Sequence, residues 1–302
     1  MDKLDLRILS ELDNNCRTPL STIGKLISKS PQYVKYRFEK LINDKIIRNV
    51  SFIQNLTLNQ TEIIAFISLK GTQIIEEQKL LDFIFKLSQT NKLYYCDGDS
   101  QIVCSFIIEK YDEIQQIKEM LYSNFTIIDN INLNTIMNTQ IYNKKFLFQG
   151  KSSSIINIEK KNNNNKEELK SKVLKQIKIN PFTSLLELGF KINVSYEKIK
   201  YLFKTNPPYI ATRLILSDTC SSKGFLLLEF KNEHEDLINY CRVCENIIQV
   251  EKIIGNYNYL ISFETLKDKE ISKIVKELIY RFNKSIEKYK RIDVLKTLKV
   301  TK

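Results

Sequence analysis

The sequence predicts an α+β chain in which one two-domain unit, three helices followed by a strand-and-helix domain, occurs twice. Residues 21–47 have the pattern of two short helices joined by a tight turn, and residues 62–138 alternate between strand and helix patterns. Shifting the sequence by 165 residues aligns 8–41 with 173–206 without a gap, with ten identities in 34 positions. We therefore interpret the second half as a degenerate copy of the first.

Length and charge limit the class of protein. The 302 residues suffice for several small domains, and the formal net charge is +12. Residues 1–50 hold ten Lys or Arg against six acids, whereas residues 51–150 hold eight against eleven. Positive charge focused in this way attracts polyanions, although a solvated lysine surface would have the same composition.

The compartment is predicted from what the sequence lacks. No run of 18 apolar residues occurs and the N-terminus is charged, so we expect no membrane span, no signal peptide and a cytoplasmic location. The six cysteines have no regular spacing, which fits reduced thiols better than a disulfide framework.

The first helix is predicted over residues 3–13. Leu4, Ile8, Leu9 and Leu12 lie on one face of that helix, so it packs behind the two short helices that follow. Together the three helices form a helix-turn-helix domain. The β-rich residues 46–56 stand in the position of a wing, so residues 1–58 are predicted to be a winged helix-turn-helix.

The start of the third helix is well specified. Ser30 stands at the N-cap and Pro31 at the first helical position, where a missing N–H costs nothing. Val34, Phe38 and Leu41 then form one apolar stripe that must face a core. The other side is cationic, amide-bearing and aromatic, which suits a recognition helix in the major groove. The predicted DNA-contacting residues are Ser30, Pro31, Gln32, Tyr33, Lys35, Tyr36, Arg37 and Lys40.

Residues 4–47 resemble the N-terminal domain of the Lrp/AsnC regulators without a gap. The resemblance implies a prokaryotic transcription regulator that binds double-stranded DNA and dimerises through a C-terminal sensor domain. Ser28 and Lys29 stand where the family usually has Gly-Leu. The matching positions are Leu4, Asp5, Ile8, Leu9, Leu12, Arg17, Ser30, Pro31, Val34, Arg37, Leu41, Ile46 and Ile47.

Residues 59–149 have the βαββαβ order of a ferredoxin-like domain. This order is similar to the Lrp/AsnC ligand-sensing domain, in which paired sheets form the dimer core and effectors, often amino acids, sit between protomers. The family's Gly-Asp-x-Asp element corresponds to Gly98, Asp99, Ser100 and Gln101, so its second acid is absent. By resemblance, the candidate effector-binding residues are Gly98, Asp99 and Gln101, with Gly255, Asn256 and Asn258 in the second copy.

The second half repeats this organisation. Residues 150–166 are rich in Ser, Asn and Lys and are predicted to be a linker. Residues 167–216 are predicted to be a degenerate winged helix-turn-helix, and residues 217–302 a second ferredoxin-like domain.

The two helix-turn-helix copies differ at positions that bear on DNA reading. In the second copy, Phe182 replaces Arg17, Glu197 replaces Gln32 and Leu202 replaces Arg37. We therefore expect the first copy to read bases, and the second to be structural or to contact phosphates through Lys198, Lys200 and Lys204.

Few residues suggest catalysis or metal binding. Cys241 and Cys244 form a lone C-x-x-C with His234 two turns earlier, but three ligands on one helix cannot all converge on zinc. Buried helix cysteines are the alternative interpretation. His234 is the only histidine, and the sequence contains no phosphate-binding glycine motif. We predict no catalytic residue, no metal and no cofactor.

The leading hypothesis is a sequence-specific DNA-binding transcriptional regulator of the Lrp/AsnC type, not an enzyme, modulated by a small amino acid-like effector. The two sensor domains could pair within one chain, and two chains, as a homodimer or higher oligomer, would then be needed to span a palindrome. One alternative is an enzyme like the siroheme decarboxylases, which are similar to tandem Lrp/AsnC units. Another is a regulator that acts by protein contact through its second unit.

Overall fold

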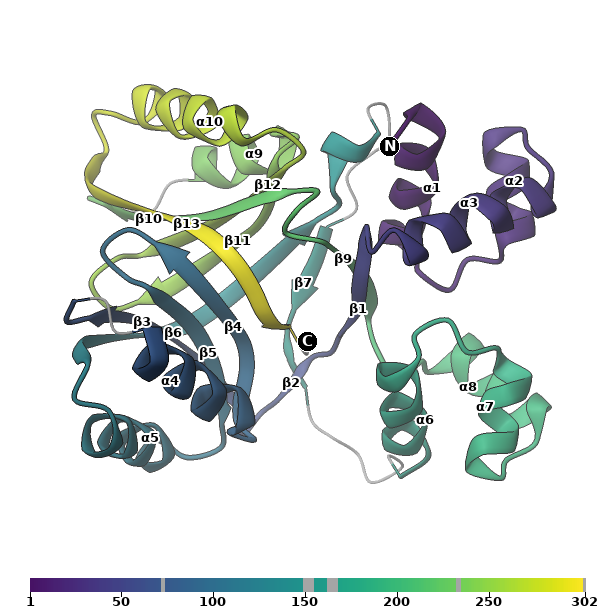
Figure 1. Cartoon of the computed structure of the whole chain (residues 1–302), viewed down its shortest axis with the longest axis horizontal. Helices are drawn as coiled ribbons and strands as arrows, with labels where there is room; N and C mark the ends of the chain where they lie inside the picture. Colours follow the sequence, from purple (N-terminus) through teal and green to yellow (C-terminus); the bar gives the residue numbers. More distant parts are fainter. Residues whose placement is uncertain (72–73, 149–154, 162–167, 232–234, 301–302) are drawn as a thin grey trace.

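The computed structural model describes residues 1–71, 74–148, 155–161, 168–231 and 235–300. Two helical units lie next to each other on one side of a body built from strands and outer helices (Figure 1). The first helical unit contains α1 (Lys3–Asn14), α2 (Leu20–Ile27), α3 (Pro31–Asn43) and β1 (Ile47–Ile53). The second contains α6 (Glu168–Ile179), α7 (Leu185–Ile192), α8 (Tyr196–Thr205) and β9 (Ala211–Leu216).

Each helical unit is followed by a βαββαβ domain, as the sequence predicts. The first consists of β3 (Thr61–Leu69), α4 (Ile74–Lys86), β4 (Thr90–Asp97), β5 (Ile102–Ile108), α5 (Tyr111–Asn124) and β6 (Ile128–Tyr142). The second consists of β10 (Ser222–Phe230), α9 (Glu235–Val243), β11 (Ile247–Ile254), β12 (Tyr259–Thr265), α10 (Asp268–Arg281) and β13 (Ile286–Val300). Across the described ranges, no helix has both the length and the apolar composition to span a bilayer.

The two ferredoxin-like domains join edge to edge into one closed barrel. The strand order is β11-β12-β10-β13-β4-β5-β3-β6, and a further pairing between β11 and β6 closes the ring. The antiparallel pairings β13–β4 and β11–β6 are therefore the two seams between the domains. They confirm that the sensor domains pair within one chain, and each seam uses a strand edge that would otherwise be open to another chain.

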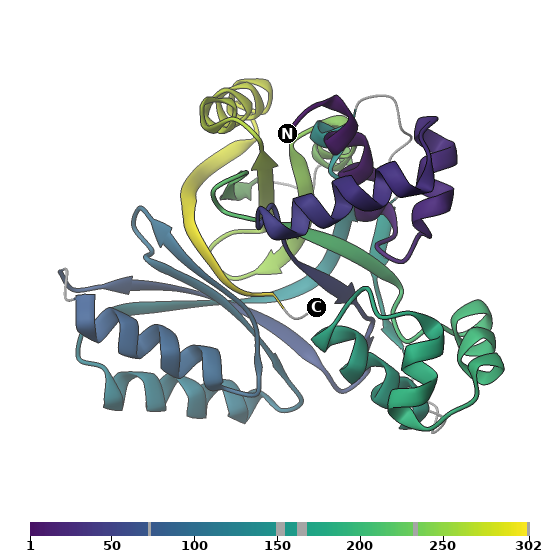
Figure 2. The same ribbon diagram turned by 45° about the vertical axis from the view of Figure 1, so that its right-hand side comes forward.

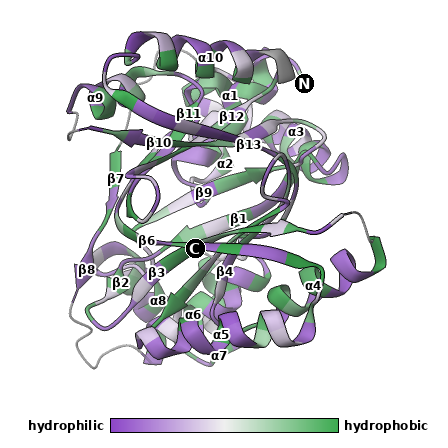
Figure 3. Ribbon diagram, turned by 90° about the vertical axis from the view of Figure 1, so that its left-hand side faces the viewer, coloured by the Kyte–Doolittle hydropathy of each residue, from purple (hydrophilic) through white to green (hydrophobic). Residues whose placement is uncertain are grey.

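Side chains alternate between two cores along the barrel strands. On β3, Ile63 and Ile67 point toward α4 and α5, whereas Ile64 and Phe66 point into the barrel. β10 repeats this pattern, with its inward residues meeting those of β3 and its outward residues packing under α9 and α10. In Figure 3, α10 lies on one side of the strands and α4 and α5 on the other. The interior is thus a shared apolar core that ties the two domains together.

The two helical units pair through their single strands. β1 and β9 form a two-stranded antiparallel sheet in which Asn49 lies opposite Ile215 and Val50 opposite Leu214. Each unit contributes the strand that follows its third helix, so an approximate two-fold axis through this antiparallel pair relates the two units. The strand expected as a wing is therefore present, but its partner belongs to the other unit (Figure 2).

The helices of both units share one hydrophobic core. Ile8 and Val34 of the first unit are fully buried, as are their counterparts Val173 and Ile199 in the second. α1 also packs on β9, and α6 on β1, so each first helix contacts the strand of the other unit. Separating the two units would expose this core, and the pair is expected to fold as one body.

The segment predicted as a linker contains regular structure. Residues 155–161 form β7 (Ile155–Ile158), which extends the sheet beside β6, and β8 (Lys160–Lys161), which pairs with β2 (Leu56–Thr57). The linker prediction for 150–166 is therefore wrong for this stretch, and its remaining residues lie outside the described ranges. The alternation of Ile with polar residues over 156–159 was the available sequence signal for a strand.

The turn between α2 and α3 explains two positions of the repeat. Ser28 ends α2 in the left-handed conformation, with φ of 56°, and Asn193 does the same in the second unit, with φ of 55°. This conformation favours glycine, which is what the family usually has at the first position. The chain then passes so close to α2 that a Cβ on Gly24 would lie 2.6 Å from the Lys29 carbonyl oxygen.

Gly24→Ala should therefore destabilise the protein, although alanine normally favours a helix. We expect the free energy of unfolding to fall by about 1–3 kcal/mol because the Cβ collides with backbone. Ser21→Ala, at an exposed position of the same helix, serves as the control and should be neutral or stabilising by up to about 0.5 kcal/mol. Urea denaturation measures both, and a Gly24→Ala protein as stable as the control would contradict the close approach.

Candidate nucleic-acid interface

The start of α3 is built as the sequence predicts. Ser30 has extended backbone angles and its Oγ accepts a hydrogen bond from the Tyr33 N–H at 3.2 Å, while Pro31 is the first helical residue. Val34 and Leu41 are buried and Phe38 is half-buried, so the predicted stripe faces the core. The N-cap at Ser30 and the buried apolar stripe together determine which side of α3 faces outward.

The outward side of α3 carries polar and cationic groups. Gln32, Lys35, Tyr36 and Lys40 are exposed, and 63% of the Tyr36 surface is accessible. Lys35 is 3.8 Å from Glu39, a contact between exposed side chains that holds it only weakly. An amide, a phenol and two ammonium groups on one free helix face can donate to base edges and phosphates.

Arg37 does not lie free on that face. Its guanidinium donates to Asp5 Oδ1 at 2.9 Å and also pairs with Asp2, and only 16% of its side chain is accessible. Asp2 caps α1, and the hydrogen bond it accepts from the Asp5 N–H, together with Arg37, lowers the pKa of its carboxyl group. Arg37 therefore ties α3 to the start of α1, which differs from the expected base-reading role.

The second unit presents a different outer face. On α8, Lys198, Lys200, Tyr201 and Lys204 are exposed, and Lys200 is 3.9 Å from Glu197. Ser195 occupies the N-cap position but its side chain makes no capping hydrogen bond in the described structure. α8 thus offers more ammonium groups than α3 and a carboxylate where α3 has an amide.

One of the three replacements noted in the sequence lies away from this face. Arg17 donates to the carbonyl oxygens of Pro181 and Thr183 and stacks on the Phe203 ring, 5.0 Å from its centroid. Its counterpart Phe182 packs edge-on against Phe38, with ring centroids 4.9 Å apart. Because positions 38 and 203 are equivalent, these are the same contact made twice across the two-fold axis. Arg17 and Phe182 therefore belong to the interface between units, not to the exposed outer faces of α3 and α8.

The residues aligned with the family's effector loop mainly hold the backbone of that loop in place. Gln101 accepts from the Leu69 N–H and donates to the Gly98 carbonyl, and Asn258 likewise bonds both backbone groups of Phe230. Each amide thus clamps the loop to the end of the first strand of its own domain. Asp99 is exposed and lies 3.7 Å from Lys290, Asn256 is exposed, and Gly98 and Gly255 lie in the two loops.

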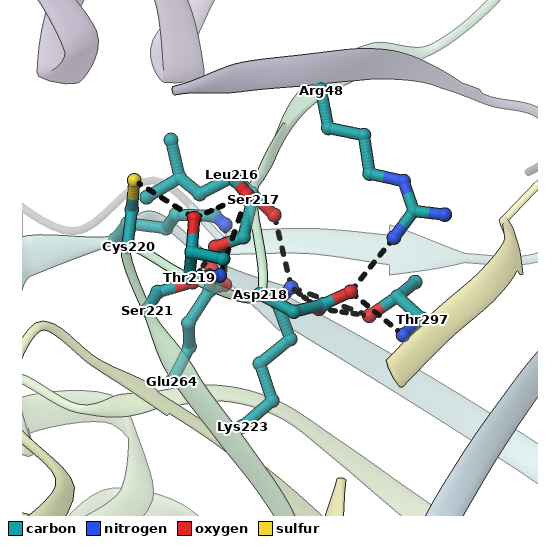
Figure 4. A network of polar contacts seen from close by, with 11 residues as sticks. Arg48, Leu216, Ser217, Asp218, Thr219, Cys220, Ser221, Lys223, Glu264 and Thr297 are labelled. Carbon is teal, nitrogen blue, oxygen red and sulfur yellow. Dashed lines mark hydrogen bonds and ion pairs between the residues drawn. The ribbon is translucent and has the colours of Figure 1, made fainter. Parts of the chain in front are cut away.

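A polar network connects the helical units with the barrel (Figure 4). Its centre is Asp218, which follows β9 and pairs with Arg48 of β1 at 2.7 Å and with Lys223 of β10 at 2.6 Å. The backbone N–H and hydroxyl of Thr297, on β13, also donate to Asp218. Burial alone would raise the pKa of Asp218, but its bonds to Lys223 and Thr297 outweigh that effect, so the pKa lies below its usual 3.8. Arg48 lies on β1, five residues beyond the end of α3.

A cavity of about 70 Å³ lies beside this network, between the β1–β9 pair and the barrel strands. Ile53 and Arg213 line it from the helical units, and Tyr94, Phe225 and Val300 line it from the barrel. Within the described ranges, no group of three or more His, Cys, Asp or Glu side chains could hold a metal ion. Cys241 is fully buried, and His234 lies outside the described residues.

Comparison with known proteins adds independent observations. A family model for the AsnC-type helix-turn-helix domain matches residues 1–42. The HTH-type transcriptional regulators LysM of Saccharolobus solfataricus and Sulfurisphaera tokodaii are each 30% identical to this chain over 135 residues, which cover 42% of this chain and 93% and 94% of theirs. Among solved structures, the siroheme decarboxylase NirDL is similar in fold over 100% of this chain and 93% of its own, with a TM-score of 0.59 and 11% identity.

Asp218→Asn should make the stability of the protein less dependent on acid pH. The folded-state pKa of Asp218 is lowered, so its contribution is full above about pH 4 and is lost as the pH falls through that folded-state value. We expect the variant to lose about 1–3 kcal/mol of unfolding free energy at pH 7, with the gap to wild type closing in acid.

Urea denaturation at pH 7 and pH 3 measures this effect. Asp129→Asn is the matched control because Asp129 is exposed, and it should follow the wild type at both pH values. A gap between Asp218→Asn and wild type that stays constant with pH would argue against a charged Asp218 at the centre of the network.

Proposed function

The chain belongs to the Lrp/AsnC family of transcriptional regulators, and we propose that one such DNA-binding chain supplies both helices of a two-helix reader. The observation that carries this proposal is the pairing of β1 with β9, which relates α3 and α8 by an approximate two-fold axis. In a homodimeric reader, symmetry places one recognition helix on each half-site. Here both helices come from one polypeptide, so one chain can address two half-sites where two chains were expected to be needed.

α3 is the base-reading helix in this proposal. Its exposed Gln32 suits the paired donor and acceptor of adenine, and Lys35 suits the acceptors of guanine. Lys40 and the exposed Tyr36 hydroxyl can donate to phosphates. Arg37 contributes indirectly, because its pairing with Asp2 and Asp5 holds α3 against α1.

α8 is the phosphate-binding helix. Lys198, Lys200 and Lys204 are exposed and carry no sequence information when they contact phosphates. Glu197 would repel phosphate but can accept from the amino group of cytosine, which sets a different preference from that of Gln32. We therefore expect an asymmetric operator, with one half-site more strictly defined than the other.

Substitutions in the two helices should affect DNA binding in different ways. Gln32→Ala and Lys35→Ala should relax the preference at the bases they contact, at a cost of about 1–3 kcal/mol each. Lys198→Ala and Lys200→Ala should weaken all sequences alike and each reduce the slope of log affinity against log salt by about 1.

In vitro selection of bound DNA, followed by titration at several salt concentrations, measures both quantities. Lys79→Ala on α4 is the control for loss of one positive charge, because Lys79 is exposed on the barrel side of the molecule. A larger change of sequence preference from the α8 variants than from the α3 variants would reverse the assignment.

A decarboxylase of siroheme is the second candidate, and the whole-chain likeness in fold to NirDL favours it. The cavity beside the network holds about 70 Å³. A cavity of about 150 Å³ accommodates benzene, and a tetrapyrrole is several times larger than benzene. The cavity would have to open widely to admit such a substrate, so we favour the regulator.

Adding siroheme to the purified protein separates the two candidates. We expect no change in the absorbance spectrum of siroheme, because the cavity is too small for the macrocycle. Hemin in a parallel titration reports nonspecific adsorption of a tetrapyrrole. A spectral change that saturates at one siroheme per chain, with no such change for hemin, would instead support the enzyme.

A further inference from the structure

The cavity between the helical units and the barrel has the features of a ligand site rather than a packing defect. It touches both halves of the repeat, through Ile53 and Ile215 on the paired strands and Tyr94 and Phe225 in the barrel. Its volume of about 70 Å³ has room for several water molecules. Cavities at such domain junctions, with apolar walls and a few convergent polar groups, are typical ligand sites.

Most charged residues of the lining form ion pairs. Four cations, Lys92, Lys144, Arg213 and Lys223, face three carboxylates, Glu62, Glu251 and Glu264. Lys92 lies 3.2 Å from Glu251 and 3.6 Å from Glu62, and Lys144 pairs with Glu264. Lys223 pairs with Asp218, which is not part of the lining.

Arg213 is the cation that these pairings leave over. It donates to the Gln249 side-chain oxygen at 3.0 Å and to the Ile248 carbonyl at 3.4 Å, and both acceptors are neutral. The amide of Gln249 in turn donates to Glu251 at 2.6 Å. Among the residues that the structure describes, no carboxylate lies within ion-pair distance of Arg213, and Asp13 and Glu264 interact with it only as more distant charges. A half-buried guanidinium has five N–H donors, so one whose hydrogen bonds go to neutral acceptors can still donate to a carboxylate beside it.

The walls and the volume limit what that anion is. Nine of the 21 lining residues are Ile, Phe or Val, and apolar walls disfavour a strongly hydrated ion such as phosphate. The volume is about half that of a cavity that holds benzene, so the occupant has on the order of three to five non-hydrogen atoms. We propose that this cavity binds a short-chain carboxylate of two or three carbons, with its carboxylate on Arg213 and its alkyl end against the apolar wall.

Such a ligand would sit next to the connection between barrel and DNA-binding units. Lys223 lines the cavity and pairs with Asp218, and Asp218 also pairs with Arg48, five residues beyond α3. A carboxylate that draws Lys223 toward the cavity weakens its hold on Asp218. Operator affinity should then depend on the ligand, a consequence that rests on the proposed DNA-binding function.

The binding itself is tested without DNA, by isothermal titration calorimetry with propionate in a buffer free of other carboxylates. We expect saturable binding at one site per chain, with a Kd on the order of 1 mM or below. Propionamide has the same shape without the charge and should bind at least about tenfold more weakly, as should inorganic phosphate. No saturable binding of propionate, or equal binding of propionamide or phosphate, would overturn the proposal.

Two variants locate the site. Arg213→Gln should weaken propionate binding by about tenfold or more, whereas Arg242→Gln, at an exposed arginine, should leave it unchanged. Val300→Phe fills the cavity from a half-exposed position and keeps the charges, so it gives a second measurement if Arg213→Gln fails to fold. Wild-type affinity in a folded Val300→Phe protein would place the bound propionate elsewhere and overturn the assignment.

Titration of the selected operator with and without propionate tests the coupling separately. If propionate binds and operator affinity changes in the wild type but not in Asp218→Asn, the route through the network is supported. An operator affinity that is the same with and without bound propionate would overturn the coupling. If the chain binds no DNA, the proposed function fails, while the calorimetry still decides the carboxylate site.

Discussion

Strand pairing across the repeat is the constraint on which the rest of the structure depends. Three antiparallel pairings, β1–β9, β4–β13 and β6–β11, each take one strand from either half of the chain. Each satisfies a row of backbone donors and acceptors that a single unit would leave open. The barrel and the pair of helical units each need strands from both halves of the chain. Neither half can therefore form either of them by itself.

Polar groups lie where the helical units meet the barrel, and they make the packing of these apolar parts more specific. Asp13 on α1 accepts from the backbone N–H groups of Lys144 and Leu214, and burial raises the pKa of its carboxyl group. Buried bonds of this kind contribute little net stability but are costly to break, so they define how the helical units sit on the barrel. The helical units and the barrel are thereby held in one orientation, and a change at the junction can reach α3 through residues already in contact.

Local sequence patterns predicted most of the helices and strands. The contacts that these patterns did not predict depend on the tertiary structure. Ser30 and Pro31 specified the start of α3 because capping depends on neighbouring residues alone, and the alternation of strand and helix patterns specified both βαββαβ domains. Arg37 appeared to be a base reader because its spacing places it off the apolar stripe, yet its partners Asp2 and Asp5 are more than 30 positions away in the chain. The strands inside the expected linker pair with β6 and β2 of the same half. The partner of β1 and the cavity, by contrast, arise from contacts between halves. A pattern read along one unit does not contain them.

The contact between Arg17 and Phe203, and its counterpart between Phe182 and Phe38, has a consequence for how the protein can diverge. In a dimer of identical subunits, any mutation at such a position enters both sides of the axis together. A single gene encoding both halves lets each side vary alone, so a cation can remain on one side while an aromatic ring evolves on the other. Mismatched halves then recognise each other better than copies of themselves, and their association no longer depends on how much protein the cell contains.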